Sequence, residues 1–217
     1  MNLFNRGASS RRSTTLVEPA DRPDFPRPGQ PDTDLTALTG NWVVDPAHSR
    51  IGFSVRHAMV TTVRGAFTDY QSRLYFDGRD ATRSGAEILL STASVQTGVD
   101  QRDSHLAGRD FLDAAAYPHM RFLSTSVELA GRDVYRMAGD LTIKNRTRPV
   151  VLELTYIGHV TDPFGYERVG FDGTTTINRS EWGLTYNSRL AEGGAMVSEK
   201  VRLQLDIAAI RATPSNG

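Results

Sequence analysis

The chain has 217 residues, a length that suits one domain with a substantial core, or one domain and a tail. Its 25 basic and 25 acidic side chains cancel, so no positive excess favours nucleic acid or an anionic membrane as a partner. The absence of cysteine excludes disulfides, thiolate nucleophiles and cysteine-ligated zinc or iron–sulfur sites. No apolar run approaches the roughly 18 residues of a spanning helix, so we expect no integral membrane segment.

The N-terminal part differs in composition from the rest. Five of the ten prolines fall between Pro19 and Pro31, mixed with arginine and aspartate, and such a composition cannot form a packed core. Arg11-Arg12 leads into a short polar stretch rather than the apolar run of an export signal. We therefore predict a disordered Pro-rich tail over residues 1–38, a flexible C-terminal tail over 213–217, and a cytoplasmic location.

From Trp42 onward apolar and polar residues alternate with a period of two, which is typical of strands with one buried face. The alternating apolar positions are Ile51-Phe53-Val55, Ala86-Ile88-Leu90, Met120-Phe122, Leu141-Ile143, Val150-Leu152-Leu154-Tyr156, Val169-Phe171 and Val201-Leu203-Leu205-Ile207. Turn signals separate these runs at Asp77-Gly78, Ala130–Asp133, Lys144–Arg146, Asp162–Gly165 and Glu192–Gly194. Many long strands with few edges favour an all-β fold closed into a barrel.

One segment, Val99 to Ala116, has a different pattern. Leu106, Phe111 and Leu112 lie among charged residues, and Pro118 follows, so we predict a short helix or two helical turns here. The carboxylates of this segment alternate with arginines, as in surface ion pairs, and do not suggest a catalytic acid and base.

The sequence offers no constellation for catalysis or metal binding. Its histidines are His48, His57, His105, His119 and His159. No two of them have the spacing of four residues found in helical zinc motifs, and we interpret them as structural. No Gly-x-Ser-x-Gly elbow, dinucleotide fingerprint or phosphate loop is present. We predict no catalytic residue, no metal and no cofactor.

Two pairs of residues stand out from this background. Arg102 and His105 lie three positions apart on the predicted helix, so they share a face that could bind an anionic head group or pair with Asp103 or a neighbouring strand. Arg179 and Trp182 form a polar and aromatic cluster that could cap a barrel end, with the indole N–H bonded to backbone.

Eight blocks of sequence occur in order between residues 41 and 210. They are Trp42–Ser49, Ile51–His57, Gly65–Phe67, Arg102–Leu106, Phe111–Asp113, Tyr117–Ser124, Gly139–Ile143 and Arg179–Leu184. In this order and spacing they resemble the YceI-like family of polyisoprenoid-binding, lipocalin-like domains. Lys144-Asn145 stands where many relatives have a turn glycine, and asparagine tolerates the left-handed backbone that such a turn needs.

The resemblance implies an extended, lipocalin-like, antiparallel eight-stranded barrel over residues 39–212 that holds an isoprenoid chain in its lumen. The inward, lumen-lining candidates are Phe53, Val55, Ile88, Leu90, Met120, Phe122, Leu141, Ile143, Leu152, Leu154, Phe171, Leu203 and Leu205. A helix from Asp100 to Ala115 would cover the entry, where Arg102 or His105 could bind a pyrophosphate or quinone oxygen.

Three functions follow as hypotheses. The first is a non-catalytic carrier that transports, stores or sequesters a polyprenyl phosphate or pyrophosphate or an isoprenoid quinone, as a monomer or a homodimer. The second is an enzyme of isoprenoid or quinone metabolism. The third is a stress-related interaction module with a filled barrel, in which the Pro-rich tail binds the partner.

Overall fold

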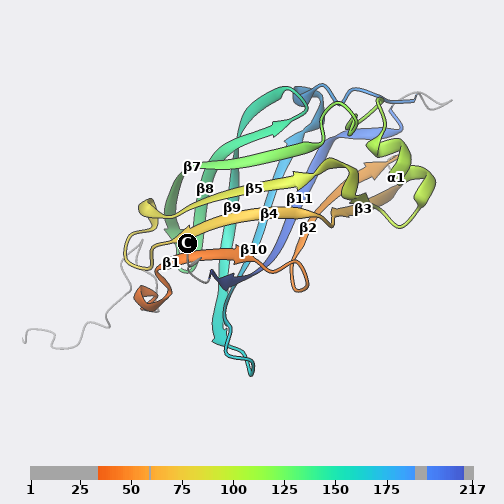
Figure 1. Ribbon diagram of the computed structural model, residues 1–217. Coiled ribbons are helices and arrows are strands. Elements are labelled where there is room, and N and C mark those ends of the chain that lie inside the picture. Colours follow the sequence, from red (N-terminus) through yellow and green to blue (C-terminus); the bar gives the residue numbers. More distant parts are fainter. Residues whose placement is uncertain (1–33, 59, 189–194, 213–217) are drawn as a thin grey trace, which may run out of the picture.

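The computed structural model describes residues 34–58, 60–188 and 195–212, and within these ranges eleven strands form one antiparallel sheet (Figure 1). The strands are β1 (Gly40–Val44), β2 (Arg50–His57), β3 (Thr61–Phe67), β4 (Tyr70–Phe76), β5 (Gly85–Ser91), β6 (Val95–Gln96), β7 (His119–Gly131), β8 (Val134–Ile143), β9 (Arg146–Thr161), β10 (Glu167–Asn178) and β11 (Val197–Arg211). The helical elements are α1 (Asp100–Ala107) and the 3-10 turns η1 (Thr36–Leu38), η2 (Ala81–Arg83), η3 (Thr92–Ser94) and η4 (Arg179–Trp182). Residues 1–33 and 213–217 of the predicted tails and the predicted turn Glu192–Gly194 lie outside the described residues.

Eight of the strands within the described ranges close into a barrel. Their order is β1-β4-β5-β7-β8-β9-β10-β11, and β11 pairs back onto β1 through Trp42 opposite Arg211. The predicted eight-stranded antiparallel barrel is therefore confirmed. Because β11 has 15 residues, it extends past β1 and pairs there with β2, which adds β3 and β6 at one end. That end carries α1, and η1 lies at the opposite end (Figure 1).

The strands form because their apolar residues recur every second position and so share the inner face. In β8, Tyr135, Leu141 and Ile143 are buried in this way. Gly139 takes the same inward position between them, and a methyl group there would lie 2.5 Å from the ring of Phe122. The glycine thus leaves room for a large side chain of the neighbouring strand.

The η1 end of the barrel is sealed by residues that we had assigned to the tail. Leu35 and Leu38 are 1% and 5% exposed and belong to the hydrophobic core. Leu35 packs so closely on Gly78 that a methyl group on this glycine would lie 1.8 Å from the Leu35 carbonyl oxygen. The ordered domain therefore begins before residue 39, because burial of two leucines offsets the entropy cost of ordering this short segment.

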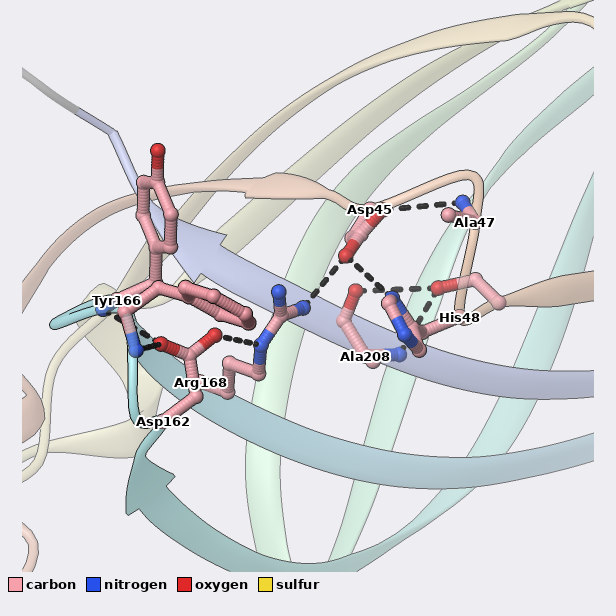
Figure 2. Close-up of polar contacts among 9 residues, drawn as sticks. Asp45, Ala47, His48, Asp162, Tyr166, Arg168 and Ala208 are labelled. Carbon is pink, nitrogen blue, oxygen red and sulfur yellow. Dashed lines mark hydrogen bonds and ion pairs between the residues drawn. The ribbon is translucent and has the colours of Figure 1, made fainter.

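A cluster of charges joins the β1–β2 connection to the β9–β10 hairpin (Figure 2). The guanidinium of Arg168 donates from Nη1 to Asp45, at 2.5 Å, and from Nε to Asp162, at 2.8 Å. His48 Nδ1 lies 2.8 Å from the same Asp45 carboxylate. The hydrogen bond from Arg168 is the main cause that lowers the pKa of Asp45 to about 2.

This cluster predicts acid sensitivity. The ionised form of Asp45 is stabilised in the folded protein, so its contribution is complete above about pH 4 and is lost as the pH falls towards 2. We expect Asp45→Asn to lower the free energy of unfolding by about 2 kcal/mol at pH 7 and by much less at pH 2. Urea denaturation at both pH values measures this. An equal loss at both would show that the charge of Asp45 is not what stabilises the fold.

Candidate functional site

The lumen of the barrel contains two apolar cavities that meet at Leu205. One, the floor cavity, has a volume of about 100 Å³ and lies at the η1 end, where Trp42 and Ala209 line it. The other, the lid cavity, has a volume of about 160 Å³ and is lined by residues of β2 and β11 and by Leu112 after α1. Leu205 lines both, so the cavities lie end to end along the barrel.

All thirteen residues that the sequence placed in the lumen line one of these cavities. Those at the floor cavity are Ile88, Phe122, Leu152, Leu154 and Phe171. Those at the lid cavity are Phe53, Val55, Leu90, Met120, Leu141, Ile143 and Leu203, and Leu205 belongs to both. The cavities are also lined by residues that are not among the thirteen predicted for the lumen, which include Trp42, Val44, Tyr135, Met137, Val169, Val201 and Ile207. Most continue the same alternation, which could have identified them.

Large side chains narrow the lumen where the cavities meet. Met120 lines the lid cavity and Phe122, two residues along β7, lines the floor cavity. The Phe122 ring lies over Gly139, and a methyl group on Gly173 would lie 2.6 Å from Leu154 and 3.1 Å from Leu205. The inward glycines therefore accept these side chains, which separate one cavity from the other.

The segment from Thr97 to Pro118, here called the cover segment, closes the lid cavity with apolar side chains. Leu106, Phe111 and Leu112 line the cavity. The predicted helix Asp100–Ala115 is shorter than expected, because α1 ends at Ala107 and extended Gly108 follows it. Turns then bring Leu112 N–H onto the Leu106 carbonyl at 3.0 Å. Leu106 thus reaches the lumen from α1, and Phe111 and Leu112 reach it from the turns that follow, in a segment for which the sequence predicted a short helix or two helical turns.

Arg102 and His105, the predicted head-group residues, both bond within or next to α1. Arg102 donates from Nε to the Thr97 hydroxyl at 2.6 Å and from Nη2 to the Thr97 carbonyl at 3.0 Å. His105 Nε2 lies 2.9 Å from the Asp110 carboxylate. Neither side chain lines the floor cavity or the lid cavity.

Hydrogen bonds to Asp103 also fix the start of the cover segment. Burial alone would raise the pKa of this carboxyl, but hydrogen bonds from the hydroxyl and the backbone N–H of Thr97 outweigh it and lower the pKa. The ring of His105 meets Phe111 at 5.1 Å and Tyr186 at 5.0 Å in edge-to-face contacts. These contacts tie α1 to the loop that follows η4.

Arg179 and Trp182 of η4 are both buried at the lid-cavity end. Trp182 is 1% exposed, and its indole N–H donates to the Leu141 carbonyl at 2.9 Å. Arg179 is 4% exposed and lines the lid cavity. The turn ends at Gly183, whose φ of 76° is the left-handed conformation that glycine adopts freely.

The β8–β9 hairpin departs from the sequence analysis in one detail. Lys144 has the positive φ, 55°, whereas we expected Asn145 to take the left-handed conformation. The hairpin still forms, with Ile143 paired to Arg146. A lysine in this conformation costs about 1 kcal/mol, which the flanking pairs of a long two-stranded ladder offset.

A closed antiparallel barrel with an apolar lumen is the architecture of lipocalin-like proteins. The model of the YceI-like domain family matches residues 42–209, so the chain belongs to that family. This confirms the resemblance carried by the eight sequence blocks. No helix in the described part of the chain is both long enough and apolar enough to cross a membrane.

Several known proteins are similar to this chain in sequence or in fold. A UPF0312 protein of Pseudomonas savastanoi pv. phaseolicola is 35% identical over 150 residues, which is 68% of this chain and 78% of the relative. The crystal structure of Burkholderia cenocepacia BcnA superposes with a TM-score of 0.67 at 26% identity, covering 78% of this chain and 99% of BcnA. A domain from Saccharophagus degradans, described as a polyisoprenoid binding domain, matches in fold with a TM-score of 0.57 at 14% identity. The match covers 80% of this chain and 99% of that domain.

Proposed function

We propose that this protein binds a single long, apolar, isoprenoid-type lipid inside its barrel and carries or sequesters it. The observation that supports the proposal is the pair of apolar cavities inside one barrel, which share Leu205 as a lining residue. An eight-stranded barrel has an interior just wide enough for one slender ligand. A structural neighbour described as a polyisoprenoid binding domain supports the same class of ligand.

Burial of apolar surface supplies the affinity in this proposal. Each buried methylene contributes about 0.8 kcal/mol, so a five-carbon isoprene unit contributes about 3 to 4 kcal/mol before ordering costs. An apolar cavity of about 150 Å³ holds one benzene ring, so the cavities at rest hold only a short piece of chain. A longer chain occupies both if Phe122 and Leu205 move aside, and Leu205 is only partly buried.

A binding role, as opposed to a catalytic one, also follows from the lining. The lumen-facing residues are almost all aliphatic or aromatic, and such side chains can neither transfer protons nor attack a substrate. Tyr135 in the floor cavity carries a hydroxyl, but burial raises its pKa to about 12, so this hydroxyl stays protonated at neutral pH. We therefore favour a carrier over an enzyme of isoprenoid metabolism.

The test is to purify the protein from its native host, extract it with organic solvent under denaturing conditions, and identify the released molecules by mass spectrometry. We expect one isoprenoid lipid at close to one molecule per chain. A barrel that is folded but carries no extractable lipid, and that takes up none from added prenyl lipids, would contradict the carrier function. Turnover of added prenyl diphosphates or quinones would assign the protein to the enzymes instead.

A further inference from the structure

The charges of the chain cancel overall, but they do not cancel on every face of the barrel. A groove on the outer face of β2, β3, β10 and β11, here called the basic groove, is lined by no acidic side chain of the described residues. Its basic side chains, all of them exposed, are Arg56, Arg64, Lys200 and Arg202. A neutral chain therefore carries a local excess of positive charge, which its composition did not indicate.

The strand register places two of these side chains at the centre of the groove. Arg202 of β11 pairs with Ser54 of β2, and Ser54 pairs in turn with Arg64 of β3. The two arginines thus lie on the same face of the sheet and two strands apart, which is about 10 Å. The short side chain of Ser54 lies between them and lines the groove.

These arginines keep their charge available to a partner. Arg202 donates from Nε to a neutral acceptor, the Thr174 hydroxyl, at 3.1 Å. Among the described residues, no carboxylate forms an ion pair with Arg64 or Arg202. Residues 189–194 lie outside the described part of the chain and contain one acidic residue, Glu192, whose single charge would still leave the groove positive.

Acidic side chains of the same face lie farther from the lid cavity. Glu153, Asp172 and Asp206 line a second hollow, together with one further arginine, and this hollow shares Arg64 and Arg202 with the basic groove. Asp206 lies four positions along β11 from Arg202, towards the η1 end. The charge of this face thus changes from positive outside the lid cavity to mixed towards the η1 end.

The basic groove lies directly outside the lid cavity. Val55 and Val201, the chain neighbours of Ser54 and Arg202, belong to the inner face and line that cavity. Beyond the groove, the turn between β2 and β3 carries Val60, which is 75% exposed. Basic side chains next to an exposed apolar one are typical of a surface that contacts an anionic membrane.

We propose that the basic groove, with Val60 at its outer end, docks the protein on the surface of a membrane that contains anionic lipids. The inference rests on the carrier function proposed above, because a carrier must exchange its lipid with a membrane. Each basic side chain near an anionic surface strengthens binding about fivefold, so several of them give reversible binding that salt weakens. Nucleic acid fits the groove less well, since no aromatic side chain of the described residues lines it for stacking on bases.

The experiment is flotation of the purified full-length protein with vesicles of phosphatidylcholine, either alone or with about 30% phosphatidylserine. We expect strong binding to the anionic vesicles only, with a loss of about tenfold or more between about 0.05 and 0.5 M salt. The double variant Arg64→Gln, Arg202→Gln should lower this binding about tenfold or more. The matched control, Arg73→Gln with Arg136→Gln, removes two exposed arginines of β4 and β8 and should leave binding within about a factor of two.

Two tryptophan variants locate the contact. The native Trp42 and Trp182 are each 1% exposed, so an added exposed indole can be distinguished by its emission. Emission of Val60→Trp should shift to the blue with anionic vesicles, as the ring leaves water. Phe164→Trp, at a position that is 86% exposed in the β9–β10 connection, should show no shift.

Equal binding to both kinds of vesicle, absence of binding, or an equal loss in the control variant would overturn the basic groove as a docking surface. A blue shift in Phe164→Trp alone would place the membrane at the β9–β10 hairpin instead. Binding to a DNA duplex and not to vesicles would assign the groove to nucleic acid. None of these outcomes affects the carrier function, which fails only if the protein neither carries nor takes up an isoprenoid.

Discussion

Replacing Trp42 by alanine is expected to lower the free energy of unfolding by about 3 to 5 kcal/mol. Trp42 is 1% exposed and lines the floor cavity, so its loss removes a large buried surface and enlarges an existing cavity. Its indole N–H donates to the Leu38 carbonyl at 2.9 Å, and the guanidinium carbon of Arg211 lies 4.5 Å from the ring centroid. The side chain of Trp42, which belongs to β1, therefore contacts both η1 and β11.

The matched variant is Trp42→Phe, which keeps a ring under Arg211 and loses the indole hydrogen bond. We expect it to cost only about 1 to 2 kcal/mol. Urea denaturation gives both values, and hydrogen exchange at the Leu38 amide, which donates to the Leu35 carbonyl at 2.9 Å, reports whether η1 detaches. A loss below about 1 kcal/mol in Trp42→Ala would show that the η1 end of the barrel does not depend on this side chain.

Filling the floor cavity is expected to remove binding of a long chain without removing the fold. Met137 of β8 is partly buried and lines this cavity, so the larger ring system in Met137→Trp would occupy space that the ligand needs. We expect the affinity for geranylgeranyl chains to fall about tenfold or more. Leaving even two methylenes unburied weakens binding by more than a factor of about ten. Affinity for a ten-carbon prenyl chain should change less, since the lid cavity remains open.

The control for this variant lies on the next strand and faces outward. Val151 of β9 pairs with Ala138 and is 47% exposed, so Val151→Trp adds the same side chain outside the lumen. It should leave both affinities within about a factor of two. Circular dichroism and thermal unfolding establish that each variant is folded. Undiminished binding of the long chain by folded Met137→Trp would mean that the ligand does not reach the floor cavity.

The inward positions could be predicted because they depend on local alternation. Phe53, Leu141 and Leu203 each lie in a run of period two, and once a strand has one apolar face that face must point into the barrel. The prediction was less successful where turns decide the outcome. Phe111 and Leu112 reach the lid cavity from turns after Gly108, and a pattern of apolar residues among charges could not distinguish these turns from a longer helix.

The role of single polar residues could not be read from spacing. Arg102 and His105 do share one helix face, but their partners, Thr97 and Asp110, lie within a few residues and draw both side chains away from the lumen. For Arg179 the sequence predicted only that it helps to cap one end of the barrel. Its position in the cavity wall depends on loops and on β11, which the sequence alone does not place around it.

The sequence by itself determined the class of fold, the family and thirteen of the residues that line the lumen, because these follow from patterns within single strands and short blocks. Only the tertiary structure decided where the domain begins, how the barrel closes and which charged residue lies in the wall of the lid cavity. The backbone of Leu35 packs on Gly78, Trp42 pairs with Arg211, and Arg179 bonds to Ser198. These contacts join distant parts of the chain, and their energies exist only after the strands have assembled around a common core.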